Sequence, residues 1–226
     1  MMKINKIFTI LLTTTLSFGL WSADITTVQD GLWSDPATWG GSLPGNSDNA
    51  IIDHVVDIDM NDRVTDLTIN GTLNFATSVN LRIRGNWTNN GTFNSNNQGR
   101  VQFRAGAHLL QGETHFWDLE TVNSTCVVKV LSTIYIHNLL KLKDGLLGGS
   151  GSAQVILFSD GVQDGRLGIC PNGNLLGDIV YMKAVSRGNG WGIYGMPFDA
   201  ALSQYSATTS GNMIYTGFTG GVNFPD

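Results

Sequence analysis

The stretch "NGTLNFATSVNLRIRGNWTNNGTFN", residues 70–94, contains the same local sequence twice, 20 positions apart. Its first five residues read Asn-Gly-Thr-Leu-Asn, and its last five read Asn-Gly-Thr-Phe-Asn. A return at an interval of this size is typical of a solenoid, in which each repeat buries its apolar face on the next coil. We expect Leu73 and Phe93 to stack inside. We also expect Asn70 and Asn90 to turn the chain at one corner, where stacked amides form a hydrogen-bonded ladder.

The rest of the chain from residue 50 onward has the same texture. Short apolar or alternating segments follow one another every 6 to 12 positions, bounded by Gly, Asn, Asp or Ser, and no helical period is found. This pattern predicts an all-β chain, and the repeat favours a parallel β-helix with an N-terminal cap. Because the period is repeated without change only once, a β-sandwich is the alternative.

The segment before the repeat is predicted to be the cap of the solenoid. Asp35 and Pro36 fit a helix N-cap followed by proline at the first helical position, and a Gly-Gly pair ends that turn. Trp33 and Trp39 supply two large apolar anchors. A solenoid needs such a cover because its first coil exposes strand edges and the end of the core.

The chain divides into four segments. Two lysines precede an uncharged apolar run that is too short for a comfortable bilayer span, which indicates a signal peptide and export to the outer surface or the medium. No later stretch reaches the length of a span. The segments are a signal peptide (1–23), a cap (24–49), β-helix coils (50–160) and a β-rich continuation, predicted to be truncated (161–226).

The charge balance argues against nucleic acid as a partner. Without the first 23 residues, 11 basic side chains remain against 18 acidic ones, and the basic residues form no cluster. Cys126 and Cys170 are even in number and fit either a disulfide in an oxidising compartment or buried free thiols. No oligomeric state follows from the sequence.

Two blocks of the sequence resemble a known family. Residues 32–75, "LWSDPATWGGSLPGNSDNAIIDHVVDIDMNDRVTDLTINGTLNF", look like the start of large exported surface proteins of Bacteroidetes-type bacteria. They are also similar to the animal domain named for its eight glycines. The later blocks "GNGWGIYGMPFDAAL" and "YTGFTGGVNFPD" are similar to a downstream region of the bacterial proteins.

The resemblance implies a right-handed parallel β-helix, secretion or surface display, and a C-terminal sorting domain. It implies an adhesive, structural or carbohydrate-binding role, with a polysaccharide or cell-surface glycan as partner, and it supplies no catalytic residues. A polysaccharide-degrading β-helix enzyme, either lyase or hydrolase, is the alternative. A third interpretation is a spacer for a domain beyond residue 226.

Aromatic side chains in Gly- or Asn-rich surroundings are the candidates for sugar binding. An exposed ring stacks on a sugar face while neighbouring amides donate hydrogen bonds. The candidates are Trp87 with Asn86 and Asn90, Trp117, and Trp191. The competing interpretation is that each ring caps a strand or fills a gap between coils.

One segment begins like a calcium-binding loop. Asp57, Asp59, Asn61 and Asp62 supply oxygen ligands at the start of a D-x-D-x-N pattern. The Gly and Glu that such a loop requires at its sixth and twelfth positions are missing. The alternative is a strand with Val56, Ile58 and Met60 inward and the acids in solvent.

Asp118 and Glu120 are the best-placed pair of acids. Two positions apart on a strand, they project on one side at a separation suited to glycoside hydrolysis. Any two acids so spaced do the same, so we assign no catalytic residue and no cofactor.

Overall fold

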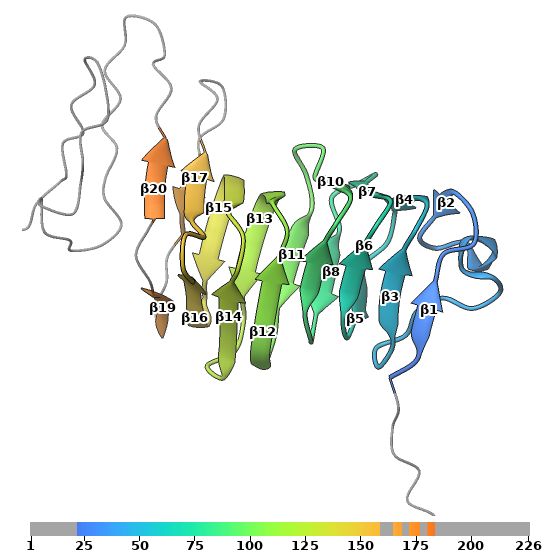
Figure 1. Ribbon diagram of the computed structural model, residues 1–226, viewed down its shortest axis with the longest axis horizontal. Coiled ribbons are helices and arrows are strands. Elements are labelled where there is room, and N and C mark those ends of the chain that lie inside the picture. The colour runs from blue at the N-terminus through green and yellow to red at the C-terminus, as the bar shows by residue number, and fades with distance from the viewer. Residues whose placement is uncertain (1–21, 159–164, 169–171, 177–179, 184–226) are drawn as a thin grey trace, which may run out of the picture.

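The computed structural model describes residues 22–158, 165–168, 172–176 and 180–183. The strands of this part pair only in parallel and form three sheets, labelled A, B and C, that run along the molecule. Each strand pairs with the strand one coil earlier and one coil later, so the chain winds around a single long axis (Figure 1). The fold is a parallel β-helix, as predicted, and not a sandwich.

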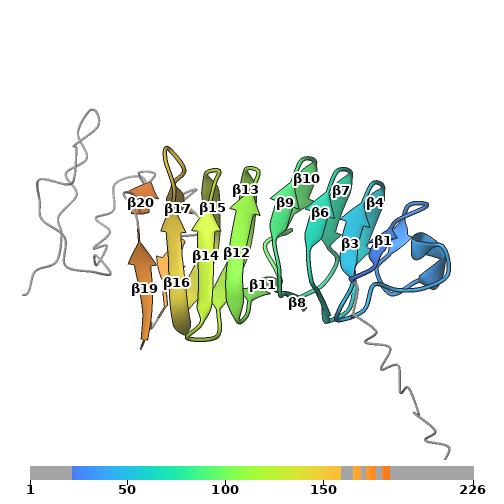
Figure 2. The same ribbon diagram turned by 60° about the horizontal axis from the view of Figure 1, so that its bottom comes forward.

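Sheets A and C take one strand from almost every coil, whereas sheet B takes strands only from the first four coils (Figure 2). Sheet A contains β1 (Asp24–Thr26), β3 (Asn49–Ile52), β6 (Leu67–Ile69), β9 (Trp87–Asn89), β12 (Gly106–Gln111), β14 (Cys126–Val130), β16 (Asp144–Gly149) and β19 (Asn172–Leu176). Sheet B contains β2 (Gly31–Leu32), β4 (Val55–Ile58), β7 (Thr72–Phe75) and β10 (Thr92–Asn94). Sheet C contains β5 (Asp62–Val64), β8 (Asn80–Ile83), β11 (Arg100–Phe103), β13 (Thr114–Thr121), β15 (Ile134–Leu142), β17 (Val155–Phe158) and β20 (Val180–Lys183), with β18 (Arg166–Leu167) beside β15.

Inward side chains repeat from coil to coil and form the core. Leu73 pairs with Phe93 in the register between β7 and β10, and both are buried, which confirms the stacking predicted from the repeat. The spacing between paired residues on sheet A is 17 from Ala50 to Leu67, 20 from Leu67 to Trp87, and 23 from Trp87 to Leu110. The coils therefore differ in length while their apolar positions stay aligned.

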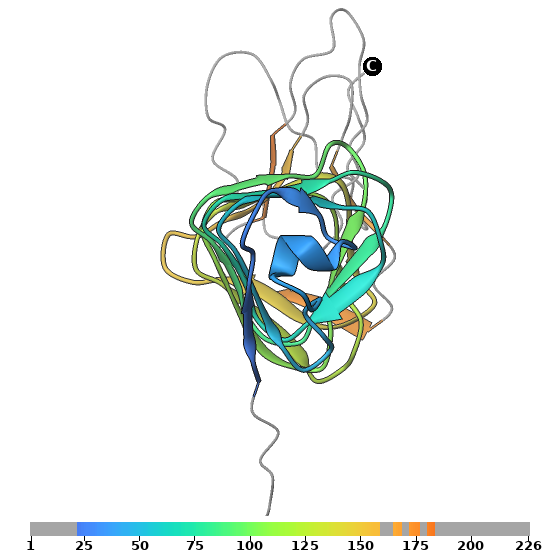
Figure 3. The same ribbon diagram turned by 90° about the vertical axis from the view of Figure 1, so that its right-hand side faces the viewer.

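The cap is a short 3₁₀ helix, η1 (Pro36–Trp39), which lies across the open end of the first coil (Figure 3). Asp35 accepts a hydrogen bond from the backbone N–H of Ala37, as the N-cap prediction requires. The rings of Trp33 and Trp39 are buried and meet edge to face at 4.8 Å. The segment 24–49 also contributes β1 and β2, which pair with the next coil.

Two amide ladders run along the outside of sheet B. At the predicted corner, Asn90 donates to Asn70 at 3.0 Å, and Asn70 donates to the carboxylate of Asp53 at 2.7 Å. On the outer face, Asn94 donates to Asn74 and Asn74 donates to Asp57, each at 2.8 Å. Each ladder therefore begins at an aspartate and continues through two asparagines.

Sheet B ends at β10. In the next coil the chain continues directly into the long strand β13, whose first half pairs with β15 rather than with β10. Within β13, a register shift between Phe116 and Asp118 lies at the position where earlier coils turn from sheet B to sheet C. The cross-section of the helix therefore changes at this point of the stack.

Parts of the predicted segmentation fall outside the described residues. Residues 1–21 of the signal peptide, Cys170 and Trp191 all lie outside them, so the disulfide stays a prediction. Within the continuation, β19 pairs with β16 and β20 with β17, so these strands extend the coils. Cys126 is buried on β14, and burial raises the pKa of its thiol to about 11, so it is neutral at pH 7.

Candidate functional site

Trp87, the leading candidate for an exposed sugar platform, is fully buried on β9. Its ring packs edge to face on Phe93 at 5.0 Å and against Phe116 at 5.2 Å, and its indole N–H donates to the Thr114 hydroxyl. The prediction of an exposed platform is wrong for this residue, and the competing interpretation, an aromatic ring that fills the space between coils, is confirmed. The Asn- and Gly-rich flanks belong to the corners on either side of a three-residue strand.

The other predicted binding residues do not converge on one site. Asn86 joins two coils, because its backbone N–H donates to Asp66 and its side-chain oxygen accepts from the backbone N–H of Leu109. Asn90 is the last member of the corner ladder. Trp117 remains half-buried at the irregular point of β13.

The four residues of the predicted calcium loop each bind a different neighbour. Asp57 accepts from Asn74, Asp59 from Ser34, and Asp62 from the indole N–H of Trp33. Asn61 accepts from the backbone N–H of Asn80. These side chains therefore spread over four separate contacts, and no structural observation supports a calcium site there.

The strand interpretation of the same segment holds for β4 and fails beyond it. Val56 and Ile58 are buried, as expected for inward positions. The expectation that Met60 points inward is wrong, because β4 ends at Ile58 and Met60 is exposed.

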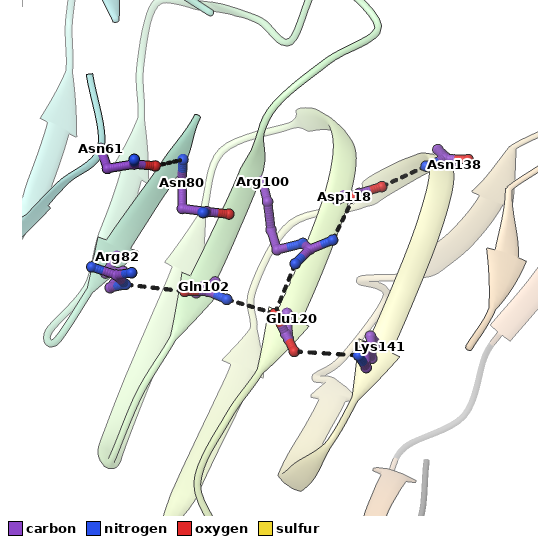
Figure 4. Close-up of polar contacts among 9 residues, drawn as sticks. All are labelled: Asn61, Asn80, Arg82, Arg100, Gln102, Asp118, Glu120, Asn138 and Lys141. Atoms are coloured by element: carbon purple, nitrogen blue, oxygen red, sulfur yellow. Dashed lines mark hydrogen bonds and ion pairs between the residues drawn. The ribbon is translucent and has the colours of Figure 1, made fainter. Parts of the chain in front are cut away.

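Asp118 and Glu120 form part of a charged row across the outer face of sheet C (Figure 4). Arg100 of β11 contacts both carboxylates, at 3.1 Å to Asp118 and 3.5 Å to Glu120. Asn138 donates to Asp118, while Gln102 donates to Glu120, whose other oxygen lies 4.0 Å from the Lys141 ammonium. No sequence pattern indicated Arg100 as the bridging cation, because that pairing depends on the register between coils.

The row is chemically well satisfied. Asp118 and Glu120 keep only 12% and 6% of their side-chain area exposed, and each accepts from a cation and from an amide. The row links three successive coils on the outer face of sheet C.

An open groove of about 390 Å³ lies where sheet B ends. The strand β10 and the loop after it form one wall, and the start of β13 and β15 forms the other. The loop turns tightly, with Asn96 and Asn97 both in the left-handed region that Asn tolerates. The lining residues are Asn89, Gly91, Thr92, Phe93, Asn94, Ser95, Asn96, Asn97, Glu113, His115 and His137.

The amides of the groove turn their NH₂ groups toward the protein. Asn89 donates to the Glu113 carbonyl at 2.8 Å and to the Thr114 hydroxyl at 3.3 Å. Its side-chain oxygen is buried and has no hydrogen-bond partner. Asn94 donates to Asn74, and Asn96 donates to the Phe75 carbonyl. The side-chain oxygens of Asn94 and Asn96 are not used in these bonds and remain as acceptors, whereas that of Asn89 is enclosed.

The imidazole rings of His115 and His137 form the other wall. Behind them, the His115 ring stacks on Tyr135 at 4.3 Å, and His137 packs on Phe158 at 4.7 Å. The Nδ1 atom of His115 lies 2.9 Å from Nε2 of His137, and the exposed carboxylate of Glu113 lies 3.6 Å from Nε2 of His115. These rings project from successive coils, so they form a continuous surface beside the acceptor groups.

No sequence pattern predicted the groove. Alternation along a strand shows which residues share a face, but the groove exists because one sheet ends. The signal available was the end of the Asn-Gly-Thr-x-Asn repeat after residue 94.

Comparison with known proteins gave no matching family model, no matching curated protein and no matching solved structure. Within the described residues, no helix has the length and apolarity to span a membrane. In that same part of the chain, no three His, Cys, Asp or Glu side chains are arranged to hold a metal ion. The site must therefore be interpreted from its own geometry.

Proposed function

We propose that this chain is a secreted or surface-displayed β-helical protein that binds carbohydrate in the groove at the end of sheet B. The observation that carries the proposal is the combination of side-chain amides with the rings of His115 and His137 along one open groove. Sugars are recognised by the same combination, since hydroxyl groups bond to planar polar side chains while the C–H face of the ring packs on an aromatic surface. Export is inferred from the N-terminal segment and from the resemblance to bacterial surface proteins.

The proposal is tested by incubating the purified chain with a panel of insoluble and soluble polysaccharides. Depletion of the protein from solution measures binding, and new reducing or unsaturated sugar ends measure cleavage. We expect depletion without product. The Asn94→Ala variant removes an acceptor from the groove, and a lost hydrogen bond worth about 1 kcal/mol weakens binding about fivefold.

The matched control is Asn90→Ala, which removes the same kind of ladder amide at a position outside the groove lining. Equal loss of binding in both variants, or depletion by no polysaccharide, would contradict the proposal. The second outcome would favour the spacer interpretation.

A polysaccharide-degrading enzyme is the second candidate, favoured by the charged row on sheet C. Arg100 between Asp118 and Glu120 is a set of acids and a cation on one face of stacked coils. If product ends accumulate, Glu120→Gln must abolish them for this row to be responsible. Loss of product in Asn94→Ala alone would instead place the reaction in the groove.

A further inference from the structure

We infer that the groove selects saccharides that carry a protonated amine, such as glucosamine residues, over neutral saccharides of the same shape. This inference rests on the proposed carbohydrate binding and names its ligand class. It follows from the direction of the hydrogen bonds in the amide ladder and from the charge at the end of the groove.

The direction of the outer ladder is set by its first member. Asp57 offers a carboxylate that accepts, so Asn74 must present its NH₂ to it. The oxygen of Asn74 then faces the next coil and accepts from the NH₂ of Asn94. Asn94 is the last member and lines the groove, and its planar amide turns its oxygen away from Asn74.

The Asn89 side chain also uses its NH₂ group toward the protein, although it belongs to no ladder. Both of its N–H groups are directed at acceptors, the Glu113 carbonyl and the Thr114 hydroxyl. Its oxygen is left buried and unpaired among the groove residues. A buried acceptor without a partner costs about 1–3 kcal/mol, and a donor that reaches it recovers that cost. The Asn89 oxygen is enclosed in the unliganded structure, so a ligand donor reaches it only when the neighbouring side chains move.

The charged groups of the groove also favour a cationic ligand. Glu113 is the one acidic residue of the lining, and its side chain is 66% exposed. Its carboxylate lies 3.6 Å from Nε2 of His115, and the lining contains two His but no Lys or Arg. The whole chain carries a formal net charge of −5. A volume of about 390 Å³ is far larger than a single ion needs and falls in the range of small-molecule sites. A sugar ring with an ammonium group meets the acceptors and the carboxylate together.

The decisive experiment uses three β-1,4-linked tetrasaccharides that differ only at carbon 2, which bears an ammonium, an N-acetyl or a hydroxyl group. Isothermal titration of the full purified chain at low salt measures each affinity. We expect the glucosamine tetramer to bind about tenfold more tightly than the glucose tetramer, the size of one charge-assisted hydrogen bond. In Glu113→Gln this preference should fall to about threefold or less, because the neutral amide keeps an acceptor but loses the charge.

The control variant is Asp144→Asn, which removes one negative charge from β16 outside the groove lining and should leave the preference unchanged. Equal binding of all three tetramers, reduced by Asn94→Ala, would overturn the amine preference while leaving carbohydrate binding in place. Binding of none of them would also overturn it, and the polysaccharide depletion assay would then decide the proposed function separately. Glu113 is exposed, so its substitution does not endanger the fold.

Discussion

At the scale of single residues, the ladders show why asparagine recurs at this surface. A side chain that must accept from one coil and donate to another needs both functions, and the amide of Asn carries both in one short planar group. The aspartates at the start of each ladder have no earlier amide to bond, so a carboxylate that only accepts suffices. The order Asp, Asn, Asn therefore follows from the hydrogen bonds that each coil must make to the coil before and the coil after it.

A double-mutant cycle tests this polarity. Asn74→Asp places a carboxylate opposite Asp57 and removes a donor, which should lower the free energy of unfolding by about 1–2 kcal/mol. Asp57→Asn alone should change it little, because an amide oxygen still accepts from Asn74.

The double variant should recover most of the loss. The new amide at position 57 then donates to the new carboxylate at position 74, which also accepts from Asn94. Urea unfolding of the four proteins measures the coupling. Additive effects of the two substitutions would show that the ladder contributes nothing beyond its separate members.

Predictions from the sequence for single residues include both the clearest success and the clearest failure. The repeat correctly predicted the Leu73–Phe93 stack and the Asn70–Asn90 corner, because side-chain direction follows from alternation and turns. It failed for Trp87, whose polar neighbours suggested exposure although its own position on β9 points inward. The residues on either side of Trp87 indicate where the chain turns. Whether a side chain is buried depends instead on its place in the in–out alternation along the strand.

At the scale of elements, the important feature is the turn between β12 and β13. Gly112 lies there at a φ of +88°, and a Cβ at this position would overlap the Asn89 carbonyl oxygen. Because residue 112 has no side chain, the chain can pass close to the Asn89 backbone and enter β13 without forming a strand of sheet B. The groove and the unpaired Asn89 oxygen therefore depend on a glycine three residues before His115.

Gly112→Ala should destabilise the protein by about 3 kcal/mol and weaken saccharide binding, since the backbone of Asn89 must move. Gly41 is the matched control, because its φ is +122° but a Cβ added there would have no neighbouring atom within 4 Å. Gly41→Ala should cost about 1 kcal/mol, from backbone strain alone, and leave binding unchanged. Thermal unfolding together with the tetramer titration measures both; similar losses in the two variants would contradict the argument.

The sequence could not have predicted this element. The sequence predicts β structure throughout this region, but which strands pair depends on whether the chain turns or continues after residue 112. Both outcomes leave the same alternation of apolar residues. The register shift between Phe116 and Asp118 absorbs the lost corner, and a one-residue irregularity of this kind has no signature in composition.

At the scale of the whole molecule, each coil contacts only its neighbours, so stability is distributed along the stack. Trp33 closes the first coil, whereas Trp87 lies between coils in the interior, and both are fully buried. Replacing either with Ala should cost about 3–5 kcal/mol. The position of the tryptophan along the axis should determine which strands become less stable.

Hydrogen exchange read by mass spectrometry distinguishes the two variants. In Trp33→Ala, protection should fall in β1 to β4 and remain in β13 to β16. In Trp87→Ala, protection should fall on both sides of the substitution. The same pattern of lost protection in both variants would show that the stack unfolds as one cooperative unit.

The winding of the chain also determines how this molecule bears load. Hydrogen bonds between coils lie along the long axis, so a pull at the two ends of the stack opens one coil at a time instead of shearing many strands together. A coil of 20 residues, such as that between Leu73 and Phe93, releases about 70 Å of extended chain when it opens. A protein tethered at one end and bound at the other would yield in small, even steps, and would dissipate force as it lengthens.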